Sequence, residues 1–216
     1  MKNLFIGKYL VIALCLLSVQ SLIAKDIYLS VNGADTNNGL SESGAVATLT
    51  KALSLIEDGD NIRVSGIIDV SKEVSGIEGV AMPQMAFSII GDSPSTSGFT
   101  GNGVTRIFNI NSNDKETQYK NLSFINGAQN QTKGSAVFIQ NSRSVFTNCI
   151  FKNNIAASCK GTVYLYTPNQ VEFYDCIFTD NQVQQGGAVF SEMRGRLVMD
   201  RCMITNCNLQ SVANSN

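Results

Sequence analysis

The stretches FTNCIFKNN (146–154) and FYDCIFTDN (173–181) are nearly identical, and each has a cysteine at its centre. The same register continues on both sides, because Leu122, Cys149, Cys176 and Cys202 follow one another at nearly equal intervals. A large apolar residue lies two places after each of these positions and Asn or Asp lies four places after, which gives the rows Phe124, Phe151, Phe178, Ile204 and Asn126, Asn153, Asp180, Asn206. A constant period of about 26 residues indicates a repeat protein.

A second set of motifs has nearly the same period. GSAVF (134–138), KGTVY (160–164) and GGAVF (186–190) follow one another at equal intervals. Short segments rich in Val, Ile, Phe, Tyr and Thr lie between turn-forming Asn, Gly, Asp and Ser residues, which is typical of strands. Helical periodicity is absent after residue 60, and propeller blades need longer repeats. We therefore expect an all-β fold, a right-handed parallel β-helix in which each strand pairs with its equivalent one coil away.

This fold explains why the same residues recur. Successive coils lie about 4.8 Å apart, so equivalent side chains stack on one another. We expect Cys149, Cys176 and Cys202 to be buried thiols beside an aromatic stack of Phe124, Phe151 and Phe178. The Asn126, Asn153, Asp180 and Asn206 row should cap buried backbone groups at a corner. Asn121, Asn148 and Asp175, at the bend before each cysteine, suit left-handed backbone angles.

The N-terminal part of the chain, up to position 60, differs from the repeats. Lys2 and Lys8 precede the apolar run YLVIALCLLSV (9–19), and the small residue Ala24 follows, as in a signal peptide over 1–24. We expect an N-terminal cap over 25–60, with a short amphipathic helix that Thr48 begins as N-cap. Residues 61–216 should form the β-helix coils, with strands in MAFSIIGD (85–92) and TRIFNI (105–110). The stretch SPSTSGFTGNG (93–103) should form a long loop.

The other end of the sequence raises a separate expectation. Counting from the previous repeats, the next strand should begin at Asn214, but the sequence given ends at residue 216. We expect either a fragment of a longer protein, or a C-terminal coil edge that pairs with another chain.

Composition narrows the functional classes. The chain has no histidine, which excludes Ser-His-Asp and Cys-His catalysis and any histidine-ligated metal. Removal of residues 1–24 takes away two lysines and no acids and leaves 14 Lys and Arg against 17 Asp and Glu, a net charge of −3. A nucleic-acid partner is therefore not expected.

Two resemblances follow from the motifs. GGAV (186–189) and GSAV (134–137), together with FKNN (151–154) and FTDN (178–181), resemble the GGA[ILV] and FxxN repeats of chlamydial-type polymorphic outer-membrane proteins; KGTV, FING and ITNC depart from them. This resemblance covers residues 119–207 and implies a β-helix at a cell surface. Residues 30–66 resemble the opening of secreted bacterial β-helix proteins, including some polysaccharide lyases, at Gly33, Asp35, Asn37, Gly39, Thr48, Gly59, Asp60 and Ile62, while Ala45 and Val46 stand in place of their Pro-Phe. That opening carries no catalytic residue to transfer.

Three functional hypotheses remain. The first is a non-catalytic exported protein, extracellular or on the outer-membrane surface, that binds a polysaccharide or a cell-surface partner and needs no cofactor. The second is a polysaccharide lyase that uses Ca²⁺ and a Lys or Arg base; its candidate acids are Asp175, Asp180, Asp200, Glu172 and Glu192, and its candidate bases are Arg143, Lys152, Arg194 and Arg196. The third is metal or redox chemistry at Cys149, Cys159, Cys176, Cys202 and Cys207, for which the spacing offers little support.

Overall fold

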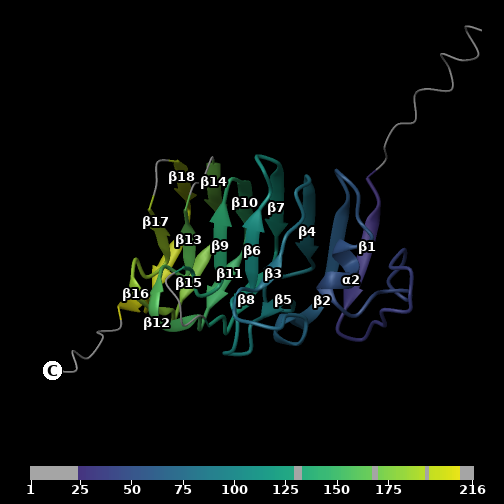
Figure 1. Cartoon of the computed structure of the whole chain (residues 1–216), viewed down its shortest axis with the longest axis horizontal. Coiled ribbons are helices and arrows are strands. Elements are labelled where there is room, and N and C mark those ends of the chain that lie inside the picture. The colour runs from purple at the N-terminus through teal and green to yellow at the C-terminus, as the bar shows by residue number, and fades with distance from the viewer. Residues whose placement is uncertain (1–23, 129–132, 167–169, 193–194, 210–216) are drawn as a thin grey trace, which may run out of the picture.

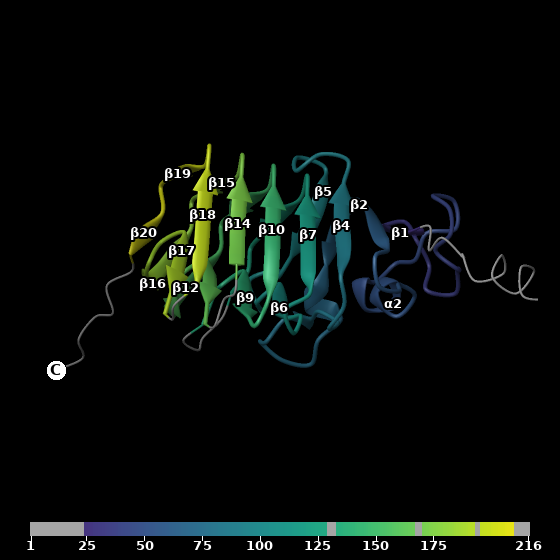
Figure 2. The same cartoon turned by 90° about the horizontal axis from the view of Figure 1, so that it is seen from above.

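The chain winds into an all-β parallel solenoid of about five turns (Figures 1 and 2). The computed structural model describes residues 24–128, 133–166, 170–192 and 195–209. The expected signal peptide, except for its last residue, lies outside the described part. No helix among the described residues is long and apolar enough to cross a membrane.

Each coil has three main sides. The first side contains β1 (Asp26–Ser30), the first half of β2 (Asn61–Asp69), β4 (Phe87–Gly91), β7 (Glu116–Lys120), β10 (Arg143–Thr147), β14 (Gln170–Tyr174) and β18 (Arg196–Asp200). The second side contains the second half of β2, β5 (Ser97–Thr100), β8 (Ser123–Ile125), β11 (Ile150–Lys152), β15 (Ile177–Thr179) and β19 (Met203–Thr205). The continuous strand β2 joins these two sides into one twelve-stranded sheet.

The third side is a separate five-stranded sheet of β3 (Val80–Ala81), β6 (Phe108–Asn111), β9 (Val137–Gln140), β13 (Val163–Leu165) and β17 (Val189–Ser191). A three-stranded sheet of β12 (Ile155–Lys160), β16 (Gln182–Gln185) and β20 (Asn208–Leu209) follows the second side in the later coils. The strands pair in parallel throughout the described chain, and the repeats predict their register: Phe151 pairs with Phe178, and Val137 pairs with Val163.

Two corners of each coil depend on left-handed backbone angles. Asn121, Asn148, Asp175 and Arg201 end the first side with φ between 50° and 56°. The second side ends in the same way at Asn126, Asn153, Asp180 and Asn206, with φ between 51° and 56°. Asn and Asp adopt this conformation more readily than most residues, which explains their recurrence. The left-handed bend that we expected before each cysteine is confirmed.

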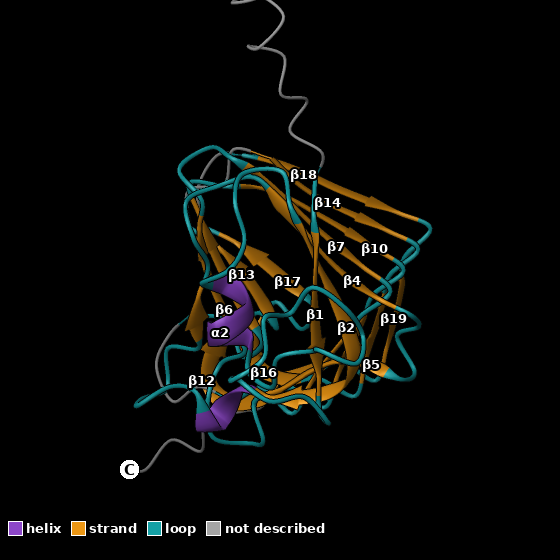
Figure 3. Ribbon diagram, turned by 90° about the vertical axis from the view of Figure 1, so that its right-hand side faces the viewer, coloured by secondary structure: helices purple, strands orange, loops and turns teal. Residues whose placement is uncertain are grey.

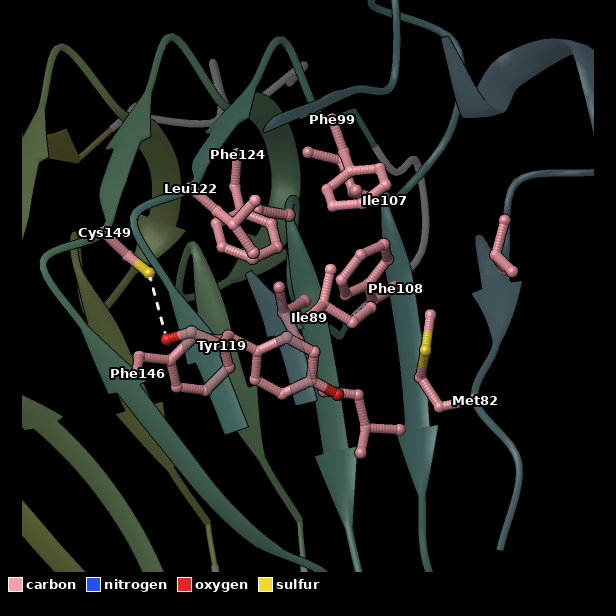
Figure 4. Close-up of a cluster of buried hydrophobic side chains, with 14 of the residues drawn as sticks. Met82, Ile89, Phe99, Ile107, Phe108, Tyr119, Leu122, Phe124, Phe146 and Cys149 are labelled. Carbon is pink, nitrogen blue, oxygen red and sulfur yellow. Dashed lines mark hydrogen bonds between the residues drawn. The ribbon is translucent and has the colours of Figure 1, made fainter. Parts of the chain in front are cut away.

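Aromatic rings stack in two columns in the interior, and Figure 4 shows part of this core. Phe151 lies between Phe124 and Phe178, with ring centroids 4.8 Å and 4.6 Å away and ring planes within 9° of parallel. A second column, from Tyr119 through Phe146 to Phe173, runs beside it with centroids 4.7 Å and 5.0 Å apart. These rings are 0% exposed, so aromatic stacking runs through the middle of the solenoid.

The N-terminal end carries a short helix, α2 (Leu49–Leu53), which Figure 3 shows lying across the end of the coils. Thr48 is its N-cap, and the Thr48 hydroxyl accepts a hydrogen bond from the Lys51 amide at 3.1 Å. Leu49 and Ala52 pack into the core. The only other regular helical segment of the described chain is the 3₁₀ turn η1 (Val70–Lys72).

The expected loop over 93–103 is wrong in part. Residues 97–100 form strand β5, which pairs with β2 and β8. Phe99 is buried and adds a ring to the interior column, 6.2 Å from Phe124. Gly98 permits the close approach of the next coil, because a Cβ there would lie 2.2 Å from the Ser123 carbonyl oxygen.

Candidate functional site

The cysteine row lies inside the coil, at the start of the second side. Cys149 and Cys176 are 0% exposed, and Cys202 is partly exposed in the last described coil. The Cys149 thiol lies 3.5 Å from the Tyr119 carbonyl oxygen of the preceding coil, and the Cys176 thiol lies 3.5 Å from that of Phe146. Burial raises the pKa of the Cys149 thiol well above its usual value. The geometry indicates packed thiols, and burial keeps the Cys149 thiol protonated.

The row therefore has the environment of small buried hydrophobes rather than of ligands. Cys149, Cys176, Cys202 and Cys207 are free thiols. The described part of the chain contains no group of three or more Cys, Asp or Glu side chains arranged to hold a metal ion. The Cys159 side chain lies outside the described residues.

The asparagine row at the second corner differs from its expected role. Asn126, Asn153 and Asn206 are exposed, and Asp180 is half-buried, so their side chains do not cap the interior. The buried amides are one residue further on, at Asn154 and Asn181, both 0% exposed. The capping interpretation of the Asn126, Asn153, Asp180 and Asn206 row is corrected accordingly: these residues form the turn.

Asn154 and Asn181 link three coils. The Asn154 side-chain oxygen accepts a hydrogen bond from the Gly127 amide at 2.7 Å. The Asn154 side-chain NH₂ donates to the Phe124 carbonyl and to the Asn181 side-chain oxygen, each at 3.0 Å. The Asn181 NH₂ donates in turn to the Phe151 carbonyl at 2.9 Å. Asn154, the second Asn of FKNN, is therefore the residue with the structural role. The two consecutive asparagines of FKNN are the sequence feature that could have indicated this.

Several lyase candidates share the outer face of the first side. We define the first-side face as the outward side chains of β7, β10, β14 and β18. Arg143 and Arg196 are exposed there and lie on either side of Gln170 in one row. Glu172 lies on the same face in the next row, and Asp200 lies one row further on, beside Tyr174. The structure thus places these four residues on one face of the first side, as their even spacing from the repeat cysteines allows.

Hydrogen bonds engage the acid groups of this face. The Tyr174 hydroxyl donates to Glu172 at 2.9 Å, and this interaction raises the pKa of Tyr174. Gln170 donates to the other oxygen of Glu172. Asp200 accepts from Arg201. Arg143 and Arg196 form no ion pair with any described residue. The exposed acid Glu116, which accepts a hydrogen bond from Gln118 at 2.8 Å, is the strand partner of Arg143 on this face.

The other lyase candidates lie elsewhere. Asp175 is at the first corner, where the Arg201 guanidinium binds it at 2.7 Å and lowers the pKa of its carboxyl group. Lys152 ends β11 on the second side, and Asp180 follows β15 at the second corner. Glu192 follows β17 on the third side. Arg194 lies outside the described residues. No acid set for Ca²⁺ forms among the described candidates.

Three grooves mark the surface. One of about 380 Å³ lies beside β1 and β2 and includes the ion pair between Asp26 and Arg63. A second, of about 550 Å³, lies between α2 and residues 73–81 and contains Glu73 and Glu78. The third, of about 530 Å³, lies at the second corner beside Asn126 and Asn153.

Comparison with protein-family models, with curated proteins and with solved structures finds no match to this chain. The fold and the side-chain geometry therefore carry the functional argument.

Proposed function

We propose that the chain is an exported, non-catalytic β-helix protein that binds a polysaccharide or a cell-surface partner along its sides. The charged and apolar pattern of residues 1–24 supports export. The GGA[ILV] and FxxN motifs, which resemble the repeats of polymorphic outer-membrane proteins, support a location at the cell surface or outside the cell.

The observation that carries the proposal is the regular spacing of exposed positions along the axis. Parallel pairing without register shifts places the same position of successive coils about 4.8 Å apart on the first and second sides. A rigid row of this kind suits a ligand that is itself a repeating polymer, because each ligand unit meets an equivalent position of the next coil. Rigid presentation also lowers the ordering cost of binding.

Binding of the purified full chain to an array of neutral and acidic glycans, and to intact cells, tests the proposal. We expect saturable binding without change to the ligand. Failure to bind any glycan or cell surface would contradict it.

A polysaccharide lyase is the second candidate. The location of Arg143, Glu172 and Arg196 on one face, the first-side face, favours it. A lyase removes a proton beside the uronate carboxylate and expels the glycosidic oxygen, which leaves an unsaturated sugar. Incubation with uronic-acid polymers and Ca²⁺, followed by ultraviolet absorbance, detects that product. Turnover that is lost in Arg143→Ala or Arg196→Ala would replace the binding proposal with the lyase.

A further inference from the structure

The groove at the second corner has a lining unlike that of the other two. Its described lining includes Asn102, Asn126, Asn153, Gly127, Ala128 and Ile155, and none of the described lining residues is charged. The first two grooves contain Asp26, Arg63, Glu73 and Glu78. Its volume of about 530 Å³ lies within the range of small-ligand sites. A neutral ligand therefore fits this groove better than a charged one.

The amides of this groove are available for hydrogen bonding. At the first corner, the Asn148 side chain donates to the Asn121 side chain at 2.9 Å, so that pair is internally satisfied. Further along the second corner, Asn206 donates to Asp180 at 3.2 Å. In the earlier coils of the second corner, Asn126 and Asn153 have the same left-handed backbone. Their side chains make no hydrogen bond with any described residue. Free amides thus occur where the groove lies.

The shape of the groove depends on Gly127. A Cβ at Gly127 would lie 2.4 Å from the Ser135 carbonyl oxygen and 2.8 Å from the buried Asn154 side-chain oxygen. No larger residue fits there without moving the buried amide row, so this part of the groove wall remains bare backbone. Ile155, which is 45% exposed, supplies an apolar surface beside it.

This combination suits a sugar ring. A side-chain amide carries one acceptor oxygen and two donor hydrogens, which match neighbouring hydroxyl groups that both donate and accept. Amides on adjacent coils are spaced for adjacent parts of one ligand. The Ile155 side chain offers a surface for the C–H face of a ring, while the absence of charge in the lining disfavours a uronate.

We propose that this groove binds an uncharged oligosaccharide through Asn126 and Asn153, with a sugar ring packed on Ile155. The inference rests on the proposed binding function and names its ligand class and site. It places the ligand at the second corner, away from the first-side face that a lyase would use.

The test uses the full chain and a panel of neutral oligosaccharides of glucose, mannose and N-acetylglucosamine, with affinities from calorimetry or saturation-transfer NMR. The double substitution Asn126→Gly and Asn153→Gly removes both amides, while glycine retains the left-handed backbone. Loss of their hydrogen bonds should weaken binding about tenfold. Ile155→Lys, which replaces the apolar surface with a long charged side chain, should weaken binding as well.

Asn121→Gly with Asn148→Gly is the matched control, because it makes the same changes at the first corner. This control should bind like the unsubstituted chain. Equal affinity of the groove variant and the control would overturn the inference, as would failure of the unsubstituted chain to bind any neutral oligosaccharide. Binding of an acidic polymer that Arg143→Ala and Arg196→Ala abolish, while the groove variant leaves it unchanged, would overturn the groove and retain the proposed function.

Discussion

Replacement of Phe151 by alanine should destabilise the protein by about 5 kcal/mol, the upper end of the range for a buried phenylalanine. Phe151 is 0% exposed and stacks face to face on Phe124 and Phe178 at 4.8 Å and 4.6 Å. Its edge also meets Phe146 and Phe173 at 5.6 Å and 6.0 Å. Each stacked pair contributes about 0.5–1.5 kcal/mol beyond the burial of its area. The loss of two such pairs therefore adds to the free-energy cost of the cavity that truncation leaves.

Phe190→Ala provides the control at a ring of the same kind. Phe190 faces outward from β17 and is partly exposed. Among the described rings it stacks on Tyr164 at 5.6 Å, and the Lys160 ammonium lies 5.3 Å from its centroid. Its loss should cost about 1–2 kcal/mol. Urea unfolding followed by far-ultraviolet circular dichroism measures both values, since the chain has no tryptophan to report by fluorescence.

Phe151→Asp extends the argument. An unpaired carboxylate in this apolar column adds several kcal/mol to the cost of truncation, and the total stability of a domain is about 5–15 kcal/mol. We therefore expect Phe151→Asp to prevent folding. A Phe151→Ala variant that loses less than about 1 kcal/mol, or no more than Phe190→Ala, would refute the stacked-column account.

Three further measurements test other parts of the fold. In thiol labelling of the native protein, Cys149 should react far more slowly than the partly exposed Cys207, because burial both shields it and raises its pKa; equal rates would contradict the interior position. Asn154→Ala should lower the free energy of unfolding by about 3 kcal/mol, since it leaves buried backbone groups unpaired. Asn153→Gly, one residue away on the surface, should change the unfolding midpoint little. Equal losses of stability in the two variants would contradict the structural role of Asn154. Desolvation opposes ionisation of Asp35, but hydrogen bonds from Thr48 and Ala47 outweigh it and lower the pKa of the carboxyl group below 3.8. The stabilisation of the cap by Asp35 should therefore be fully present well above that value and lost as the pH falls through the lower folded value. Hydrogen-exchange protection factors at residues 34–48, corrected for the intrinsic rate at each pH, that do not fall in acid would count against this.

The repeat period predicted most of the architecture because translation along one axis imposes the same environment on every coil. A slot that suits Cys149 also suits Cys176, and the ring of Phe151 lies over that of Phe178 for the same reason. Once two sets of motifs shared nearly one period, register, direction of pairing and the identity of the core followed together.

The parts that escaped prediction are those in which composition and neighbours disagree. Residues 97–100 have the Ser, Gly and Thr content of a turn, yet β2 and β8 on either side pair with them as a strand. The roles of Asn153 and Asn154 differ because the left-handed turn at Asn153 directs its successor inward. By contrast, Arg143 and Arg196 each lie six residues before a cysteine of the repeat, so the spacing already predicted the row that they share with Gln170.

The near-identity of the contacts above and below the coil that begins at β10 has an evolutionary consequence. Because Phe124, Phe151 and Phe178 stack in nearly the same way, loss or duplication of one complete period would leave matching surfaces at the junction. Unequal recombination within such a gene can lengthen or shorten the rod without redesign of its interior. The length of the solenoid is then the property that changes most readily between generations. The distance over which its sides present binding groups changes with it.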